Sequence, residues 1–375
     1  MSGLYIHIPF CERKCSYCAF YSIPKPPVAP EPSGEGGWKN VPEFFQTLEE
    51  ELKNLPDGFL PETVFIGGGT PTALDFQMLE RFLPMLASRL LAQASDAGRF
   101  SPQEFSCEAN PGTVDEAKLA LLKRSGVNRL SIGVQSFDSQ CLETLGRIHS
   151  AGQAEAAFRM ARAAGFKNTG LDLMFGVPGQ TMQKLETDLD RALALCPEHI
   201  SIYNLMYEDG TPLTVCDPEK IDEGLEREMY DMIRRRLKAA GFVHYEISNF
   251  AKPGFECKHN LLYWSGGDYI GVGPAAHSHW KGVRWANVSD LEDYCINGPR
   301  HEFEETLERM AKERETLVMG LRRLKGVEVS AGLWDELHDS FKSFEKAGLL
   351  VLDGRHVRLS ESALFVSDAV FAELV

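Results

Sequence analysis

The chain alternates short apolar-rich segments with amphipathic helical patterns, and this alternation constrains its fold more than any other feature. Six segments are predicted to be strands: residues 3–8, 63–67, 104–108, 129–135, 169–174 and 199–203. Helical patterns with a period near 3.6 separate or follow them, for example at Leu79, Phe82, Leu83, Leu86 and Leu90. Strands that alternate with helices form parallel βα units, so we expect an α/β barrel or a doubly wound sheet.

The predicted strands are apolar on one face only, whereas parallel strands that are covered on both faces are usually continuous apolar runs. In the first strand, Leu4, Ile6 and Ile8 share one face, and Tyr5 and His7 share the other. Polar residues also stand at or near the C-terminal ends of later strands, namely Glu108, Gln135 and Asp172. A polar interior indicates a lumen that holds a ligand. We therefore predict a partial (β/α)6 TIM-like barrel with its site at the C-terminal ends of the strands.

The chain is predicted to have three parts. Residues 1–245 form the partial barrel, 246–305 a connecting segment, and 306–375 a C-terminal, mostly helical, winged-helix-like domain. In this last part we expect a helix at 306–321, two shorter helical stretches within 332–347, and a hairpin that turns at Asp353-Gly354. Residues 22–37, rich in proline and glycine, are predicted to be an irregular surface loop.

Composition excludes several classes of function. The 375 residues carry a net charge of −15 without a basic stripe, which argues against nucleic-acid binding, also by the winged-helix-like part. No apolar tract is long enough to span a bilayer, and the N-terminus lacks the pattern of a signal peptide. The nine cysteines are odd in number and mostly dispersed, so they do not indicate a disulfide framework. We expect a cytoplasmic protein.

The one tight group of cysteines is CERKCSYC, which places Cys11, Cys15 and Cys18 in a short loop after the first strand. Structural zinc prefers four protein ligands, usually in two separated pairs, and His7 lies inside the strand and is a poor fourth ligand. Iron–sulfur clusters use cysteine thiolates in such compact runs. Three cysteines on a four-iron cluster leave one iron without a protein ligand, which makes that iron a site for chemistry.

The CxxxCxxC spacing, Tyr17 before the last cysteine, and the position of the loop after the first strand resemble the radical SAM superfamily. This resemblance implies a 4Fe-4S cluster on the three cysteines. It also implies that the open iron binds S-adenosylmethionine (SAM), which an electron from the cluster splits to a 5′-deoxyadenosyl radical. The segment GGGTPT at residues 67–72 matches the superfamily's glycine motif, which meets the SAM amino group and needs a backbone without Cβ atoms.

The resemblance extends over nearly the whole chain to the oxygen-independent coproporphyrinogen III oxidases and their relatives, the HemW-like heme chaperones. The matching segments are YIHIPFC, GGGTPT, CEANPG, GVQSF, LGRIHSA, DLMFGVPGQT and YEISNFAKPG. By position, it implies that SAM is contacted by Tyr5, Gly68, Gly69, Thr70, Glu108, Gln135, Arg147 and Asp172. These residue types suit SAM, because the carboxylates of Glu108 and Asp172 can accept hydrogen bonds from its ribose hydroxyls and Arg147 can pair with its carboxylate.

Two features separate the oxidases from the chaperones. The oxidases have a longer N-terminal extension and a further cysteine two residues after the triad, where this chain has Phe20. The HNxxYW pattern typical of the HemW-like proteins is present here as His259, Asn260, Tyr263 and Trp264. The resemblance implies that these residues contact heme or a porphyrin, with His259 the first candidate iron ligand. His277 is a weaker candidate, which could instead order its own loop.

We therefore favour a radical SAM protein that binds heme and delivers it to apo-hemoproteins. A reductant protein is an expected partner, and a transient recipient in the membrane is kept as an alternative. The second hypothesis is an enzyme, an oxygen-independent coproporphyrinogen III oxidase that decarboxylates porphyrinogen propionates by hydrogen abstraction. The third is a radical SAM methyltransferase or a heme-degrading relative. The fold does not decide among them, because function lies in the site.

Overall fold

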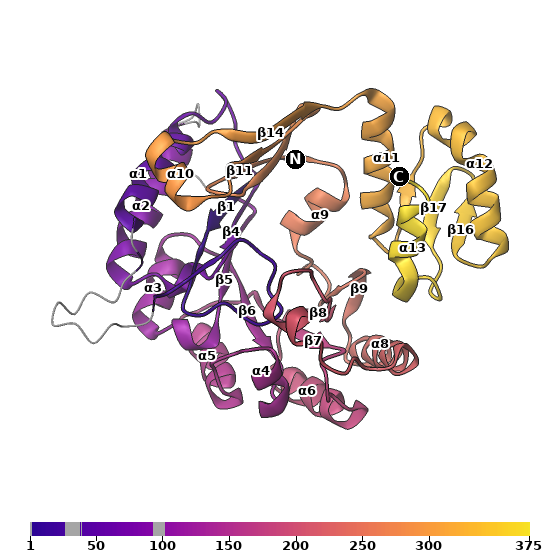
Figure 1. Cartoon of the computed structure of the whole chain (residues 1–375), viewed down its shortest axis with the longest axis horizontal. Coiled ribbons are helices and arrows are strands. Elements are labelled where there is room, and N and C mark those ends of the chain that lie inside the picture. Colours follow the sequence, from indigo (N-terminus) through magenta and orange to yellow (C-terminus); the bar gives the residue numbers. More distant parts are fainter. Residues whose placement is uncertain (1, 27–37, 39, 93–101) are drawn as a thin grey trace.

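The structure is a computed structural model that describes residues 2–26, 38, 40–92 and 102–375. Figure 1 shows a long, curved sheet with helices along its outer side and a separate group of helices and strands, in yellow, at the C-terminal end. The predicted loop at residues 22–37 lies mostly outside the described residues; its described beginning includes β3 (Ile23–Pro24), which pairs in parallel with β2 (Phe10–Cys11).

Six consecutive parallel strands form the middle of the large sheet and confirm the predicted partial barrel. They are β1 (Ser2–Ile8), β4 (Thr63–Gly68), β5 (Glu104–Ala109), β6 (Arg129–Gln135), β7 (Thr169–Phe175) and β8 (His199–Asn204). Each lies within two residues of its predicted bounds. The alternation of apolar and polar residues was decisive, because side chains of a strand point alternately to its two faces.

The helices that follow these strands cover the outer side of the sheet (Figure 1). They are α1 (Val41–Lys53), α2 (Phe76–Ala92), α3 (Glu116–Arg124), α4 (Ser139–Thr144), α5 (Ala151–Ala163), α6 (Met182–Ala194) and α8 (Glu223–Ala239). Shorter elements lie at the C-terminal ends of the strands: η1 (Pro71–Ala73), η2 (Pro111–Thr113) and α7 (Pro212–Cys216). Leu4, Ile6 and Ile8 of β1 are fully buried in one core with Phe44 of α1 and Leu83 of α2.

Further strands extend the sheet at both edges, so the barrel does not close. Beyond β8 lie β10 (Asn249–Ala251), which pairs antiparallel with β8, and then β9 (Val243–Glu246), which pairs antiparallel with β10. Beyond β1 lies the parallel β11 (Asp268–Val272), followed by the antiparallel β12 (His277–Trp280), β13 (Val283–Asn287) and β14 (His301–Thr306). Thus the predicted connecting segment, 246–305, contributes strands to the sheet as well as α9 (Lys258–Trp264) and α10 (Leu291–Asn297).

The C-terminal part contains α11 (Arg309–Leu321), β15 (Val327–Glu328), α12 (Ala331–Lys346), β16 (Leu350–Asp353), β17 (His356–Leu359), η3 (Leu364–Val366) and α13 (Ser367–Ala372). The predicted hairpin is confirmed as β16 and β17, with β15 as a third antiparallel strand. The prediction of two short helical stretches in 332–347 was wrong. The segment is one helix, because Leu333, Leu337 and Phe341 form a continuous buried stripe at a spacing of four residues.

The helix predicted from residue 306 begins instead at Arg309, because Thr306 ends β14. The boundaries of the three predicted parts, at residues 245 and 305, stay predictions. No helix in the described part of the chain is both long enough and apolar enough to cross a bilayer.

Candidate functional site

The cysteine loop is held in place by backbone contacts from two distant segments. The N–H of Ser16 donates to the carbonyl of Leu145 (3.1 Å), and the N–H of Leu213 donates to the carbonyl of Ser16 (2.8 Å). Within the loop, the N–H of Cys18 donates to the carbonyl of Cys15 (3.3 Å). These bonds fix the middle of the loop between α4 and α7, so the three half-buried thiols are presented from a defined backbone.

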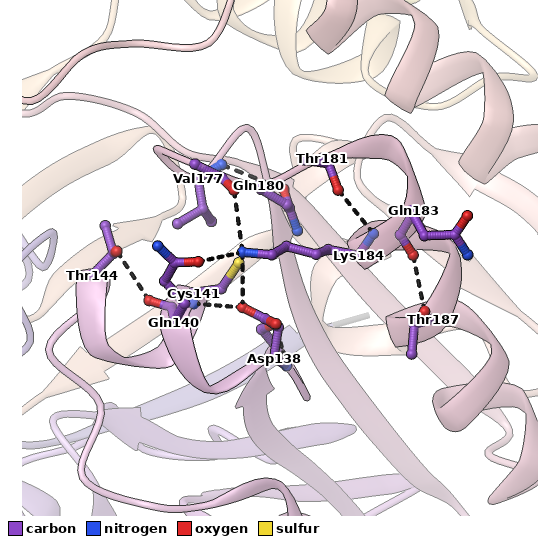
Figure 2. Close-up of polar contacts among 12 residues, drawn as sticks. Asp138, Gln140, Cys141, Thr144, Val177, Gln180, Thr181, Gln183, Lys184 and Thr187 are labelled. Atoms are coloured by element: carbon purple, nitrogen blue, oxygen red, sulfur yellow. Dashed lines mark hydrogen bonds and ion pairs between the residues drawn. The ribbon is translucent and has the colours of Figure 1, made fainter.

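A polar network joins α4 to α6 (Figure 2). Lys184 of α6 donates from Nζ to Gln140 Oε1 (2.7 Å) and to the carbonyl of Gly179 (3.3 Å). Its Nζ also lies 3.4 Å from Asp138 Oδ1, and the same oxygen accepts the N–H of Cys141 at the start of α4. Leu145 directly follows α4. This network therefore sets the position of the Leu145 carbonyl, which accepts the hydrogen bond from Ser16 of the cysteine loop.

Arg147 brings a cation to the cysteines. Its Nη1 lies 3.3 Å from Cys15 Sγ, and its Nη2 donates to Asn110 Oδ1 (2.5 Å) and to the carbonyl of Gly133 (2.6 Å). Burial disfavours the guanidinium charge, but the neighbouring Cys15 raises the pKa of Arg147 above its usual value. Arg147 is therefore placed to offset the negative charge of the thiolates that metal binding requires.

The glycine run, which begins within β4 at Gly67 and Gly68 and continues to Gly69, packs directly on the segment that leads from β1 into the cysteine loop. The N–H of Gly69 donates to the carbonyl of Ile8 (2.8 Å), and the N–H of Thr70 donates to that of Phe10 (2.8 Å). A Cβ on Gly69 would lie 2.7 Å from the carbonyl oxygen of Phe10. Thr70 Oγ1 accepts from Asn110 Nδ2 (2.7 Å) and lies 3.5 Å from Cys11 Sγ.

Two half-buried carboxyls, Glu108 on β5 and Asp172 on β7, lie on the polar face with β6 between their strands. Burial, together with the charge of Asp172, raises the pKa of Glu108 to about 8. Burial also raises the pKa of Asp172, whose Oδ1 accepts from Ser131 Oγ (3.0 Å). A carboxyl with a raised pKa gains most from a cationic ligand, so Glu108 marks a place where a positively charged group would be bound favourably.

Gln135 ends β6 in a conformation that is unusual for its residue type. Its φ of 64° lies in the left-handed region, and the pairing of β6 with β7 shifts register between Gly133 and Gln135. A non-glycine residue there costs about 1–2 kcal/mol, a strain that is found disproportionately at functional sites.

Most of the predicted SAM and cluster residues line one cavity, which we name the cysteine cavity. Its lining includes Tyr5, Cys11, Cys15, Cys18, Gly68, Gly69, Thr70, Glu108 and Arg147. Gln135 and Asp172 do not line it, although Asp172 acts electrostatically on Glu108. Sequence reasoning did not single out Asn110, which also lines the cavity and joins Thr70 to Arg147. Its signal was its position two residues after Glu108, on the same face of the chain.

The cysteine loop is not preformed as a site for a single ion. Among the described residues, no three side chains of His, Cys, Asp or Glu are grouped so that they could hold one metal ion. Three thiols around an open cavity, with Arg147 beside one of them, fit a larger, negatively charged group such as an iron–sulfur cluster.

A second cavity adjoins the first and shares Tyr5, Phe20 and Glu108 with it. We name it the aromatic cavity because it is lined by the rings of Tyr5, Phe20, Phe65, Tyr263, Tyr269, His259 and His277. Asn260 also lines it. Trp264 does not; its ring packs under Arg322, whose guanidinium carbon lies 4.5 Å from the ring centroid. The HNxxYW residues are thus divided between the cavity and the contact with the C-terminal part.

His259 is tied into the protein at both ring nitrogens. Its Nδ1 lies 2.8 Å from Thr63 Oγ1 and its Nε2 lies 2.8 Å from Tyr263 Oη. The side chain is almost fully buried, and burial lowers the pKa of the imidazole to about 3. Coordination of iron by His259 therefore requires that one of these hydrogen bonds be broken, and its assignment as a ligand stays a prediction.

The chain is similar to proteins of a known family. Residues 5–192 match the model of the radical SAM superfamily. The heme chaperone HemW of Bacillus subtilis is 40% identical over 343 residues, covering 87% of this chain and 85% of the relative. HemW of Escherichia coli is 39% identical over 278 residues, covering 73% and 69%. The chain belongs to the HemW family of radical SAM proteins. Membership in this superfamily implies a 4Fe-4S cluster and SAM.

A solved structure supports the fold. Coproporphyrinogen III oxidase (HemN) from Escherichia coli, described as a radical SAM enzyme, superposes with a TM-score of 0.81. The match covers 100% of this chain and 89% of that chain. At 20% identity the likeness concerns the fold alone.

Proposed function

We propose that Cys11, Cys15 and Cys18 ligate a 4Fe-4S cluster whose fourth iron faces SAM in the cysteine cavity. The support is that all three cysteines line one cavity together with the glycine run and Arg147. When bound, the cluster supplies an electron to the sulfonium of SAM. The chain's own contribution is to hold the thiolates, offset their charge through Arg147 and keep the group partly shielded from water.

The same cavity offers complementary contacts for SAM. The backbone at Gly68, Gly69 and Thr70 allows a close approach, and Tyr5 closes one wall. Glu108 and Asp172 are carboxylates for cationic or hydroxyl groups of SAM, and the strained Gln135 lies on the strand between them. The raised pKa of Glu108 supports this role, because a positive charge would relieve the cost of ionising a half-buried carboxyl.

The function that the geometry supports best is that of a heme chaperone: the chain binds heme in the aromatic cavity and delivers it to apo-hemoproteins. The observation that carries this proposal is the aromatic cavity itself, which joins the cysteine cavity and contains three residues of the HNxxYW pattern. Aromatic faces suit a porphyrin, and imidazoles suit its iron. The relatives named as heme chaperones support the same assignment.

The proposal includes a reductant protein for the cluster and an apo-hemoprotein that receives the heme, in the cytoplasm or at the membrane. A cytoplasmic location fits the free thiols, because reducing compartments keep cysteines available for metals. The HNxxYW residues His259, Asn260 and Tyr263 are proposed heme contacts, and Trp264 is proposed to couple α9 to the C-terminal part.

The test is an anaerobic reconstitution of the full chain with iron and sulfide. The protein is then given SAM and a reductant, together with either coproporphyrinogen III or heme. We expect a stable Soret band with heme and no turnover of coproporphyrinogen III. A decarboxylated porphyrin product would contradict the chaperone proposal and establish an oxidase.

A further inference from the structure

Three imidazoles line the aromatic cavity, and they differ in what their nitrogens contact. Two are engaged at both nitrogens. His259 bonds Thr63 and Tyr263, as described above, and His7 bonds Tyr5 Oη through Nδ1 (3.0 Å) and the carbonyl of Tyr21 through Nε2 (2.9 Å). The carbonyl of Tyr21 can only accept, so His7 Nε2 carries the proton and Nδ1 accepts from Tyr5. Neither nitrogen of His7 is therefore available without breaking a bond.

The third imidazole, His277, is in the opposite situation. It is exposed at the start of β12, lines the aromatic cavity, and has no side-chain hydrogen-bond partner among the residues that the structure describes. A neutral imidazole with a free nitrogen that faces a cavity is what a metal ion requires of a protein ligand.

The backbone that presents His277 is strained and firmly held. Ala275 has a φ of 59°, in the left-handed region that residues with a Cβ rarely occupy. Two hydrogen bonds tie this turn to the end of β13. The N–H of Ala275 donates to the carbonyl of Val288, the residue after β13 (3.0 Å), and the N–H of Asn287, the last residue of β13, donates to the carbonyl of Ala276 (2.9 Å). Such strain persists only where the surroundings impose it and is concentrated at functional sites.

The clamp extends into the core of the sheet. Asn287 Nδ2 donates to the carbonyl of Gly273 (2.9 Å) and to Glu51 Oε1 (2.5 Å), and Glu51 Oε2 accepts the N–H of Gly273 (2.8 Å). Glu51 lies on α1, so the turn before His277 is fixed to an element on the outer side of the sheet. The backbone that carries His277 is thereby held at one place on the cavity wall.

Phe20 offers a porphyrin an exposed aromatic ring at the aromatic cavity. Its ring lines the aromatic cavity, yet 72% of the residue is exposed, the largest exposure of any described phenylalanine. Phe20 also lines the cysteine cavity, so a flat ligand covered by this ring would lie beside the cluster site. Burial of such a ring against a flat apolar face is favourable, because it removes apolar surface from water on both partners.

We propose that His277 is the protein ligand to the heme iron and that Phe20 covers the porphyrin. His259 and His7 then serve to hold the cavity wall. This assignment rests on the proposed function, because it presupposes that heme enters the aromatic cavity. It departs from the expectation drawn from the HNxxYW pattern, in which His259 was the first candidate.

The experiment compares heme binding by the cluster-loaded full chain and by His277→Ala, His259→Ala and, as a matched control, His338→Ala. His338 is an exposed histidine on α12, outside both cavities. Ferric heme is titrated under anaerobic conditions and followed by the Soret band and the EPR signal of the ferric iron. Circular dichroism and the cluster absorbance report whether each variant is folded and loaded.

We expect His277→Ala to lose the imidazole-ligated signature and to bind heme about tenfold more weakly or worse, a change of at least 1.4 kcal/mol. Free imidazole should restore the signature, because it replaces the missing side chain. His338→Ala should match the unaltered protein, and the folded fraction of His259→Ala should keep the signature.

A signature that His277→Ala leaves unchanged would overturn the ligand assignment while the proposed function stands. The assignment would also be overturned if folded His259→Ala lost the signature. If the unaltered, cluster-loaded protein bound no heme, the proposed function itself would fail, and the assignment with it. Phe20→Ala gives a second measurement: weaker binding with an unchanged iron signature is expected, and unchanged binding would remove Phe20 from the site.

Discussion

The glycine run offers the sharpest structural prediction, because one added methyl group at Gly69 would meet only backbone. A Cβ there would lie 2.7 Å from the carbonyl oxygen of Phe10, 2.9 Å from the carbonyl carbon of Pro9 and 3.0 Å from the carbonyl oxygen of Ile8. No side chain can rotate away to relieve these contacts. Gly69→Ala must therefore displace the segment that leads into Cys11, or separate β4 from it.

The size of the effect follows from the same contacts. Overpacking a well-packed site typically costs about 1–3 kcal/mol of stability, and three backbone contacts at or below 3.0 Å place this substitution toward the upper part of that range. The two hydrogen bonds from Gly69 and Thr70 to Ile8 and Phe10 would be strained as well. We expect the free energy of unfolding to fall by about 2–3 kcal/mol, with lower cluster loading because the loop starts from a shifted backbone.

The matched control is Gly112→Ala. Gly112 lies in η2, near Asn110, but a Cβ there would have no heavy atom within 4 Å, and its φ is outside the left-handed region. An added methyl group at such a place reduces the entropy of the unfolded chain, so stability should stay the same or rise by up to about 1 kcal/mol. Cluster loading should equal that of the unaltered protein.

Both variants are measured in two ways. Denaturant unfolding of the cluster-free protein gives the free energy of unfolding, and anaerobic reconstitution followed by iron, sulfide and visible absorbance gives the loading. Equal stability and loading of the two variants would refute the argument, since it would show that a Cβ at residue 69 fits against the backbone of residues 8–10 without displacing it.

Three further substitutions probe the cysteine cavity. Cys15→Ser should abolish the brown cluster absorbance, while Cys196→Ser, at an exposed cysteine outside the cavity, should keep it; absorbance that survives in Cys15→Ser contradicts the triad assignment. Arg147→Met should lower cluster loading by removing the cation 3.3 Å from Cys15 Sγ, and Arg147→Lys should restore it only in part, because one ammonium cannot span the three partners; full loading of Arg147→Met would show that the charge is dispensable. Since the folded pKa of Glu108 is raised to about 8, its contribution to stability is full below pH 4.5 and is lost as the pH rises through 8. Between pH 5 and 9, the melting temperature of the cluster-free protein should therefore fall less for Glu108→Gln than for the unaltered protein. Parallel curves of melting temperature against pH would mean that Glu108 titrates normally.

The sequence predicted the barrel strands well because their period of two is a local property. The strand from Leu4 to Ile8 needs only its own alternation to be recognised, and β1 indeed buries these residues. The edge strands β11 to β14 were missed because they contain no comparable alternating apolar run. Their pairing depends on β1 and on one another, which no window of the sequence reveals.

The cysteines, the glycine run and Arg147 line one cavity, because loops after parallel strands meet at one end of a barrel. Their roles toward a cluster and SAM stay predictions. The partners of His259 could not be foreseen, since Thr63 is 196 residues away in the chain. The free imidazole of His277 and the backbone strain at Ala275 likewise depend on contacts between distant segments.

The most direct test of the account is a heme-transfer measurement with the full, cluster-loaded chain. Heme-loaded protein is mixed anaerobically with an apo-hemoprotein, separated from it by size, and both fractions are examined for the Soret band. The account predicts that heme moves intact to the acceptor. Heme that stays with the chain, or reaches the acceptor no faster than free heme does, would contradict the central claim that this protein is a heme chaperone.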